Sequence, residues 1–385
     1  MNVDISIVMP CLNEAESLPY AIQSAKQALL GLEERRLTGE ILVADNGSTD
    51  GSQDIARQHG CQVVHCPTRG YGNALLFGIS HAKGRYIVMG DADASYDFTE
   101  SLPMVEKLEQ GYDLCMGSRF RGNILSGAMP WKNRYIGNPL LTKTLDVLLK
   151  SGMSDVFCGL RAFTRKAFNL MKLKSAGMDF AIEMVVKASL LRLRRTEVPI
   201  TLSPDRRRNG HSTLKPWRDG WCGMKLILRH SPLWLFFVPA LVMIGLSTLI
   251  FLALLFTPPQ QSFTLGFLRL GDHWMILAAG GFIIGYQILI FGINSAIFHY
   301  QQNNSPSLEK FIRFCTLENA ILLSTFLILC GMFTVGYILS KWISQNFGPL
   351  FEYRLMIIST ILMIIGVQTF FAGFVFSVFL EDIKR

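Results

Sequence analysis

Two carboxylates stand two residues apart in the segment Gly90-Asp91-Ala92-Asp93, directly after the apolar run 86–89. Carboxylates spaced in this way at a strand end can approach one divalent cation. Hard cations such as Mg²⁺ prefer carboxylate oxygens and keep phosphates and waters as further ligands. A bare D-x-D sequence is more often a solvated turn, but the preceding apolar run favours a metal site formed by Asp91 and Asp93.

Polar residues also follow the first two expected strands, in Pro10-Cys-Leu12-Asn13-Glu14 and at Asp45. A carboxylate at Glu14 or Asp45 is suited to holding the base or the ribose hydroxyls of a nucleotide. The alternative is purely local, because Asn13 can cap the following helix and Asp45 can close its own turn. Three acidic turns at successive strand ends favour a shared site.

Short strands and helices alternate along the first part of the chain. Strands are predicted at residues 4–9, 40–44, 62–65, 85–89 and 112–116, and helices at 15–32, 53–59, 72–82 and 99–110. Such alternation is typical of an α/β layered sheet that is mainly parallel. Ligands in these sheets bind beyond the carboxyl ends of the strands, which is where the acidic turns fall. Residues 120–134 are predicted to be a long loop, either a mobile lid over the site or an ordinary connection.

Charge is distributed unevenly along the 385 residues. Only 17% are charged, against about 25% in an ordinary soluble domain, and 50% are hydrophobic. Residues 1–230 hold 30 of the 37 Lys and Arg and 23 of the 29 Asp and Glu, so residues 231–385 carry only 13 charges. The division excludes a disordered chain or a nucleic-acid-binding tail, and it indicates a soluble domain followed by a membrane domain.

Four charge-free windows in the second part are each long enough for a spanning helix, which needs roughly 20 apolar residues. Spans are predicted at residues 233–256, 274–298, 319–342 and 355–379. A buried helical core is the alternative, but too little polar surface remains to cover one. The predicted domains are therefore 1–215, a juxtamembrane segment 216–230 and a four-helix membrane domain 231–385.

Basic residues near the span ends predict the orientation. Seven of them lie on the side of the N-terminal domain and three on the other side. We therefore expect the soluble domain and the C-terminus to be cytoplasmic, and the first ten residues show no signal peptide. The eight cysteines have no C-x-x-C spacing, so reduced thiols are expected rather than a zinc site or a redox pair.

The motifs together resemble family 2 glycosyltransferases, which have the GT-A fold, and within them the dolichyl-phosphate mannose synthase and polyprenyl-phosphate glycosyltransferase group. The resemblance spans about residues 3–215 and follows the order of the family's motifs. It rests on Pro10…Asn13-Glu14, Asp45-Asn-Gly-Ser-Thr-Asp50, Asp91-Ala-Asp93, Gly117-Ser-Arg119, Asp155…Gly159-Leu-Arg161 and Arg207-Arg-Asn-Gly210-His-Ser212.

The resemblance implies transfer of one sugar, with inversion, from GDP-mannose or UDP-glucose to polyprenyl or dolichyl phosphate at a membrane. It implies the following roles. Donor binding falls to Pro10, Leu12, Glu14, Asp45 and Asp91; Mg²⁺ or Mn²⁺ binding falls to Asp91 and Asp93; acceptor phosphate binding falls to Arg119, Arg134, Arg207 and Lys215; and Asp93, Arg119 and Arg207 are the catalytic set. The partners are a nucleotide-sugar, the lipid and the membrane, with no nucleic acid.

Two positions depart from the family's pattern. Ser95 stands where a Gln usually assists the metal, and Thr213 stands where a Lys usually follows the R-x-x-G-x-S element. A processive polysaccharide synthase is an alternative, but its Q-x-x-R-W element is absent. A transporter or scaffold with an inactive domain is a second alternative, against which the scarcity of ionisable residues in the spans argues.

The segments that flank the membrane domain have their own predictions. Residues 216–230 combine aromatic, apolar and basic side chains, as in a helix that lies on a membrane surface, although two glycines weaken the helix prediction. The basic run 206–208 is either a solvated, topogenic run or a phosphate-binding one. Gly280, Gly281, Gly285 and Gly292 suit close helix packing in a bundle or a homo-oligomer.

Overall fold

The computed structural model describes residues 3–206, 216–258, 261–266, 268–303 and 316–384. The chain divides into two compact units, Met1–Ile227 and Leu228–Arg385, and each is described by itself.

The first unit is built around a seven-stranded sheet with the order β3-β2-β1-β4-β6-β5-β7. The strands are β1 (Ile5–Cys11), β2 (Gly39–Asp45), β3 (Gln62–His65), β4 (Tyr86–Met89), β5 (Leu114–Ile124), β6 (Arg161–Thr164) and β7 (Arg195–Leu202). Only β6 runs antiparallel to its neighbours. The carboxyl ends of β1, β2, β4, β5 and β7 therefore lie at one edge of the sheet, as the strand pattern predicted.

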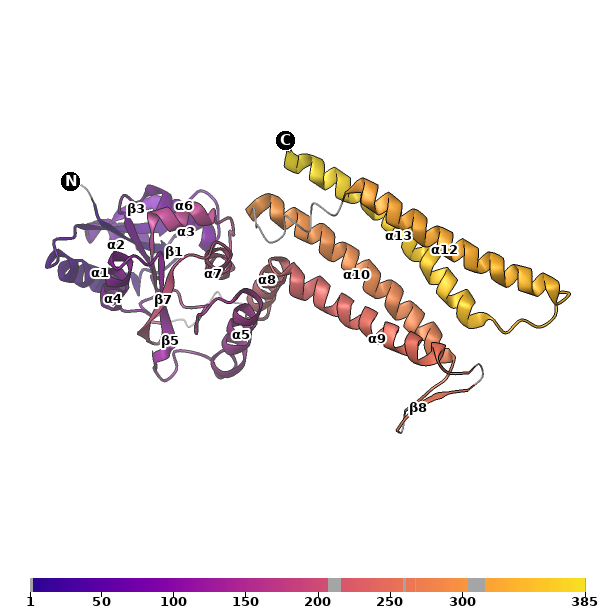
Figure 1. Ribbon diagram of the computed structural model, residues 1–385. Coiled ribbons are helices and arrows are strands. Elements are labelled where there is room, and N and C mark those ends of the chain that lie inside the picture. The colour runs from indigo at the N-terminus through magenta and orange to yellow at the C-terminus, as the bar shows by residue number, and fades with distance from the viewer. Residues whose placement is uncertain (1–2, 207–215, 259–260, 267, 304–315, 385) are drawn as a thin grey trace. The chain divides into compact units, whose positions relative to one another are not determined.

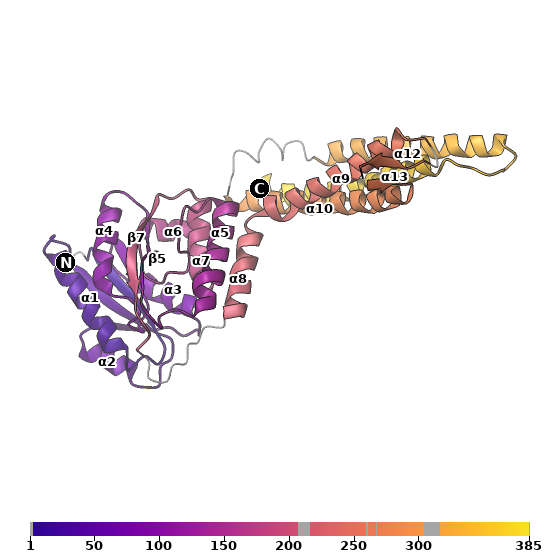
Figure 2. The ribbon, with the colours of Figure 1, turned by 90° about the horizontal axis from the view of Figure 1, so that it is seen from below.

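Helices cover both faces of this sheet (Figure 2). They are α1 (Leu18–Glu33), α2 (Ser52–Gln58), η1 (Phe98–Ser101) and α4 (Leu102–Glu109) on one face, and α3 (Tyr71–His81), α5 (Asn138–Leu149), α6 (Arg165–Met171) and α7 (Phe180–Leu190) on the other. Strand β1 alternates accordingly, since Ile5 and Ile7 enter one core while Val8 enters the other. The result is a three-layer α/β/α unit with two cores.

The largest difference from the expected elements concerns β5. The sequence predicted a strand at 112–116 and a loop at 120–134, but β5 continues to Ile124. Its second half pairs with β7 after a register shift between Ser118 and Asn123. A short π-helix, η2 (Asn133–Gly137), then leads into α5. The predicted loop is therefore wrong over most of its length, because pairing with a strand that comes about eighty residues later extends β5.

The juxtamembrane segment forms a helix, α8 (Pro216–Arg229). Its two glycines do not prevent this, and one of them has a packing role, because a Cβ on Gly223 would collide with Ile182 of α7. Ile227 is fully buried in the same core as α7. The opposite, exposed side of α8 carries Arg218, Trp221, Lys225 and Arg229. That spacing places aromatic and basic groups on one helix face.

The second unit contains four long apolar helices that lie side by side (Figure 1). They are α9 (Val238–Leu255, preceded by the π-helix η3, Leu233–Phe237), α10 (His273–Asn303), α12 (Leu317–Ser344) and α13 (Tyr353–Lys384), with a hairpin of β8 (Phe263–Leu265) and β9 (Leu268–Leu270) after α9. Segments long and apolar enough to cross a membrane are Trp234–Leu255, His273–Ile297, Leu317–Ser344 and Tyr353–Phe379. The bounds of these four candidate spans agree with the predicted ones to within about two residues at each end.

Glycines let these helices approach closely. A Cβ on Gly285 of α10 would lie 3.1 Å from the carbonyl oxygen of Ala240 in α9, whereas a Cβ on Gly280 would meet nothing within 4 Å. The pair α12 and α13 uses Gly331 and Gly366 in the same way. Packing within the chain therefore accounts for Gly281, Gly285 and Gly292 but not for Gly280, and a homo-oligomer stays a prediction.

We expect Gly331→Ala to destabilise the membrane unit by about 1–3 kcal/mol, because overpacking of a tight interface costs this much. The added Cβ would lie 2.9 Å from the backbone oxygen of Ser359 and 2.6 Å from Cγ of Met363. Gly336→Ala on the same helix is the matched control, since a Cβ there meets nothing within 4 Å. The half-denaturation temperature in one detergent measures both; equal values for the two variants would contradict the packing argument.

Arg354, at the start of α13, joins three helices of this unit. Its Nε donates to Asp272 Oδ1 at 2.8 Å, and one terminal nitrogen donates to the carbonyl of Leu254 at 2.6 Å. Tyr353 donates its hydroxyl to the same aspartate. These contacts fix the end of α9 and the starts of α10 and α13 against one another.

Candidate active site

The loops after β1 and β2 are joined by side-chain hydrogen bonds. Asn13 donates its backbone N–H to Ser48 Oγ at 2.9 Å, and its side-chain oxygen accepts the backbone N–H of Thr49 at 2.9 Å. Glu14, 7% exposed, donates its N–H to Ser52 and accepts the Ser17 hydroxyl at 2.7 Å. Asn13 therefore holds the loop after β2 by hydrogen bonds and does not cap α1. Pro10 and Leu12 lie in the same segment as Asn13, at the end of β1 or directly after it.

Asp45 is buried beneath this pair of loops, at 1% exposure. Its carboxylate accepts the backbone N–H groups of Gly47 and Ser48 and the side-chain amide of Gln53 at 2.8 Å. These contacts match the turn-closing alternative. A direct contact of Asp45 or Glu14 with a nucleotide stays a prediction.

Cys11 lies in the same region, but its chemistry is limited by burial. Burial raises the pKa of its thiol to about 12, so the thiol stays protonated at neutral pH and is a poor nucleophile. The seven cysteines within the described residues are all free thiols, as expected for that part of the chain.

The two carboxylates after β4 have different surroundings. Asp93 Oδ1 accepts both the backbone N–H and the hydroxyl of Ser95, at 3.0 and 2.6 Å. Asp91 Oδ1 instead accepts the hydroxyl of Tyr71, at 2.8 Å. Ser95, at the position where the family's pattern has a Gln, thus orients Asp93.

The carboxylate oxygens of Asp91 and Asp93 suit a cation that is also bound by a substrate. Asp91 and Asp93 both offer hard oxygen ligands at the carboxyl edge of the sheet. No group of three or more His, Cys, Asp or Glu side chains in the described part of the chain could hold a metal ion alone. A Mg²⁺ site needs no such cage when one or two carboxylates share the ion with substrate phosphates and water. The residues present therefore fit a cation bound together with a diphosphate.

Arg119 lies at the end of the fully buried part of β5 and forms a two-pronged ion pair with Asp155. Nε donates to Oδ2 at 2.6 Å and a terminal nitrogen donates to Oδ1 at 2.7 Å. Arg119 is 8% exposed and Asp155 is fully buried. This geometry indicates that Arg119 holds the loop before β6 in place, and its predicted phosphate contact and catalytic role stay predictions.

Arg161, the last residue of the D-x-x-x-G-x-R element, is fully buried and donates to three backbone carbonyls, those of Val156, Cys158 and Ala181. Its role in the structure is to close the loop before β6. Gly159 in the same element lies directly beside Asp91, because a Cβ there would collide with the Asp91 carboxylate.

The remaining predicted basic residues fall in two places. Arg134 lies in η2, half-buried, with its guanidinium over the ring of Tyr135 at 5.5 Å. Arg207 and Lys215 lie outside the described residues. Ser203, just past β7, donates its N–H to the carbonyl of Ser95 at 2.9 Å. Arg206, before the gap, stacks over Tyr20.

Sequence reasoning missed Tyr71, Asn46 and Tyr96. Tyr71 begins α3 and contacts Asp91, and Asn46 follows Asp45 and accepts the N–H of Gly70 at 2.7 Å. Tyr96 accepts the N–H of Gly159 at 3.0 Å. The sequence could have suggested these residues because they follow predicted strands at the carboxyl edge. It could not have shown which distant side chains they contact.

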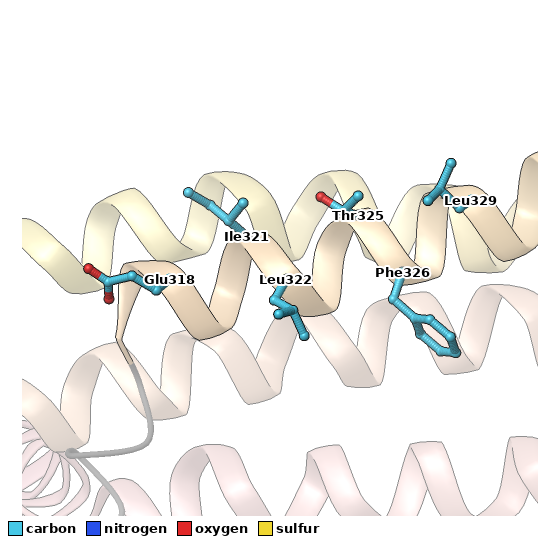
Figure 3. A pocket seen from close by; sticks show the side chains of 6 residues that line it. All are labelled: Glu318, Ile321, Leu322, Thr325, Phe326 and Leu329. Carbon is cyan, nitrogen blue, oxygen red and sulfur yellow. The ribbon is translucent and has the colours of Figure 1, made fainter.

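The membrane unit has a shallow apolar strip on one face of α12 (Figure 3). It is formed by Glu318, Ile321, Leu322, Thr325, Phe326 and Leu329. Residues at this spacing share one side of a helix. An apolar strip of this kind is what a membrane-facing helix surface presents, so it indicates no separate site.

Comparison with known proteins decides the family. The family model for glycosyl transferase family 2 matches residues 6–171, and the model for the glycosyltransferase family 2 C-terminal transmembrane region matches residues 295–380. The low-salt glycan biosynthesis hexosyltransferase Agl6 of Haloferax volcanii is 35% identical over 96% of this chain and 87% of its own length. The chain belongs to glycosyltransferase family 2. It is a membrane glycosyltransferase with a GT-A domain, as the motifs indicated.

Other known proteins match over shorter stretches. The glycosyltransferase AglJ of Haloferax volcanii is 33% identical over 56% of this chain and 68% of its own length. Among solved structures, glucosyl-3-phosphoglycerate synthase from Mycobacterium tuberculosis, crystallised with Mn²⁺ and UDP, covers 60% of this chain and 80% of its own, with 20% identity and a TM-score of 0.46.

Proposed function

We propose that this glycosyltransferase transfers one hexose, with inversion, from a nucleotide-sugar to a polyprenyl phosphate at the cytoplasmic face of a membrane. GDP-mannose and UDP-glucose are both candidate donors. The name of the full-length relative, a hexosyltransferase of glycan biosynthesis, supports the hexose. The balance of basic residues near the span ends supports the cytoplasmic side.

The observation that carries the donor half is the meeting of the acidic turns at one edge of the sheet. Asn46 joins the Asp45 turn to Gly70, at the start of α3, through a 2.7 Å hydrogen bond. The next residue, Tyr71, contacts Asp91. The predicted base-binding and diphosphate-binding carboxylates are thus linked through one short segment.

In the proposed reaction, a nucleoside diphosphate leaves the sugar at the carboxyl edge of the sheet. A divalent cation, when bound, neutralises the charge that develops on the leaving diphosphate. Asp91 and Asp93 are the residues that would hold it. The acceptor phosphate is already ionised at neutral pH, so the protein needs to orient it rather than to remove a proton from it.

The acceptor half is supported by an exposed surface on the first unit. We define the η2–α5 face by its exposed apolar residues Trp131, Tyr135, Ile136, Leu140 and Val147 and its exposed Lys132, Lys143 and Lys150. Aromatic and aliphatic groups flanked by basic ones suit contact with a lipid surface. Arg134 lies within this face, and a planar guanidinium suits a phosphate headgroup.

One assay tests the proposal. The purified full-length protein, Mn²⁺ or Mg²⁺ and a short polyprenyl phosphate are incubated with a panel of radiolabelled nucleotide-sugars. One labelled sugar should enter the organic phase as a charged, acid-labile lipid. Polymeric product would indicate the processive alternative. No transfer from any donor in the panel would contradict the proposal.

Within that assay we expect Arg134→Ala to raise the KM for polyprenyl phosphate about tenfold, since charge-assisted hydrogen bonds contribute roughly this much. The KM for the donor should change less than twofold. Lys166→Ala is the matched control, because it removes an exposed charge on α6, outside the η2–α5 face. Equal effects of Arg134→Ala on donor and acceptor would move this arginine to the donor side.

A further inference from the structure

Hydrogen bonds fix the backbone on both sides of Tyr71, the first residue of α3. The residue before it, Gly70, donates its N–H to Asn46 Oδ1 at 2.7 Å, and the residue after it, Gly72, donates its N–H to the carbonyl of Ala176 at 2.9 Å. Neither glycine can carry a side chain, because a Cβ on Gly70 or Gly72 would collide with the backbone oxygen of residue 176 or 175.

The segment that holds Gly72 is itself anchored. Glu183 of α7, 5% exposed, accepts the backbone N–H groups of Lys174 and Ser175 at 2.9 and 2.8 Å. A buried carboxylate that accepts two backbone donors gives a rigid support. The start of α3 is therefore held from two directions, by Asn46 and by the segment that Glu183 fixes.

This rigid backbone aims the Tyr71 phenol at Asp91, at 2.8 Å. The phenol hydroxyl donates this hydrogen bond, since an ionised carboxylate can only accept one. On its other side the Asp91 carboxylate lies against Gly159, which leaves room for it because a Cβ there would collide with Oδ2. Tyr96 holds Gly159 in place through the 3.0 Å bond to its N–H.

We propose that Tyr71 is a positioning residue that selects the orientation of Asp91 in which its carboxylate can bind a divalent cation on the donor diphosphate. The inference rests on the proposed function. The hydroxyl supplies one hydrogen bond that favours the observed side-chain rotation, and Gly159, which has no Cβ, leaves space for the carboxylate there. Without the hydroxyl, this orientation of Asp91 is less favoured before the cation binds, and the difference appears as weaker binding.

Tyr71→Phe removes only the oxygen and keeps the ring in the core. The test measures Mn²⁺ binding to the full-length protein through the EPR signal of free Mn²⁺. Separate titrations are made with UDP and with GDP, both without acceptor. The apparent Kd for Mn²⁺ should rise about tenfold in Tyr71→Phe with the nucleotide that the wild-type protein prefers. Transfer activity should recover toward the wild-type kcat when Mn²⁺ is raised accordingly.

Tyr112→Phe is the matched control, since this half-buried tyrosine lies before β5, away from the carboxyl edge, and packs against Arg194. Its Kd for Mn²⁺ should equal that of the wild-type protein, and both variants should denature within about two degrees of it. Unchanged or tighter Mn²⁺ binding in Tyr71→Phe overturns the positioning role, as does a loss of activity that excess Mn²⁺ does not rescue. If the wild-type protein binds no Mn²⁺ with either nucleotide, both this inference and the metal-dependent function fail.

Discussion

Asp93→Ala is expected to lower sugar transfer about a hundredfold to a thousandfold while the protein still folds and inserts into the membrane. Asp93 and Asp91 are the two carboxylates that would hold the cation on the leaving diphosphate. Losing one of two protein ligands removes electrostatic stabilisation that acts mainly in the transition state, and such losses cost on the order of 10²–10³ or more in rate. Initial rates at saturating donor and acceptor measure the effect.

Folding should tolerate the change, because the contacts made by Asp93 that are described here are local. Asp97→Ala is a close control: Asp97 accepts the N–H and the hydroxyl of Thr99, as Asp93 accepts those of Ser95. Both variants lose a carboxylate that accepts two local hydrogen bonds, which lowers the free energy of unfolding by about 1 kcal/mol. Only Asp93 is one of the two carboxylates predicted to bind the cation. Transfer by Asp93→Ala at the rate of Asp97→Ala would remove the catalytic assignment.

Secondary-structure elements that depend only on the local sequence could be predicted from the sequence. The strand Gln62–His65 has the predicted bounds, and the four membrane helices follow from charge-free windows, because hydrophobic periodicity and length need no knowledge of the fold. The carboxyl-edge position of Asp91 and Asp93 followed from the alternation of strands and helices, since parallel strands share one edge.

Features set by distant pairing were not predictable. The second half of β5 looks like a loop in the sequence, with Gly122 in it, and becomes a strand only against β7. The glycines of α8 lower helix propensity, yet Gly223 permits contact with Ile182 and the packing outweighs the propensity. The partner of Asp91 is Tyr71, twenty residues earlier, and that of Arg119 is Asp155, thirty-six later.

The pairing of Arg119 with Asp155 leads to the second large prediction. Asp155→Ala should destabilise the catalytic unit by about 3–5 kcal/mol, because it leaves a buried guanidinium without its partner. Asp155 is fully buried and also accepts the backbone N–H of Arg119 at 3.1 Å. The thermal exposure of buried thiols to a fluorescent maleimide reports this loss, since Cys11, Cys115 and Cys158 are all buried in this unit.

The double variant Arg119→Met/Asp155→Ala distinguishes a stabilising role of Arg119 from a direct role in sugar transfer. Removing both charges should recover part of the stability lost in Asp155→Ala alone, because no unpaired charge then stays buried. A double variant less stable than Asp155→Ala would show that the ion pair is not what stabilises this loop. If the recovered protein transfers sugar at near the wild-type rate, Arg119 acts by packing; if it is folded but inactive, with normal donor binding, the guanidinium itself serves the acceptor phosphate.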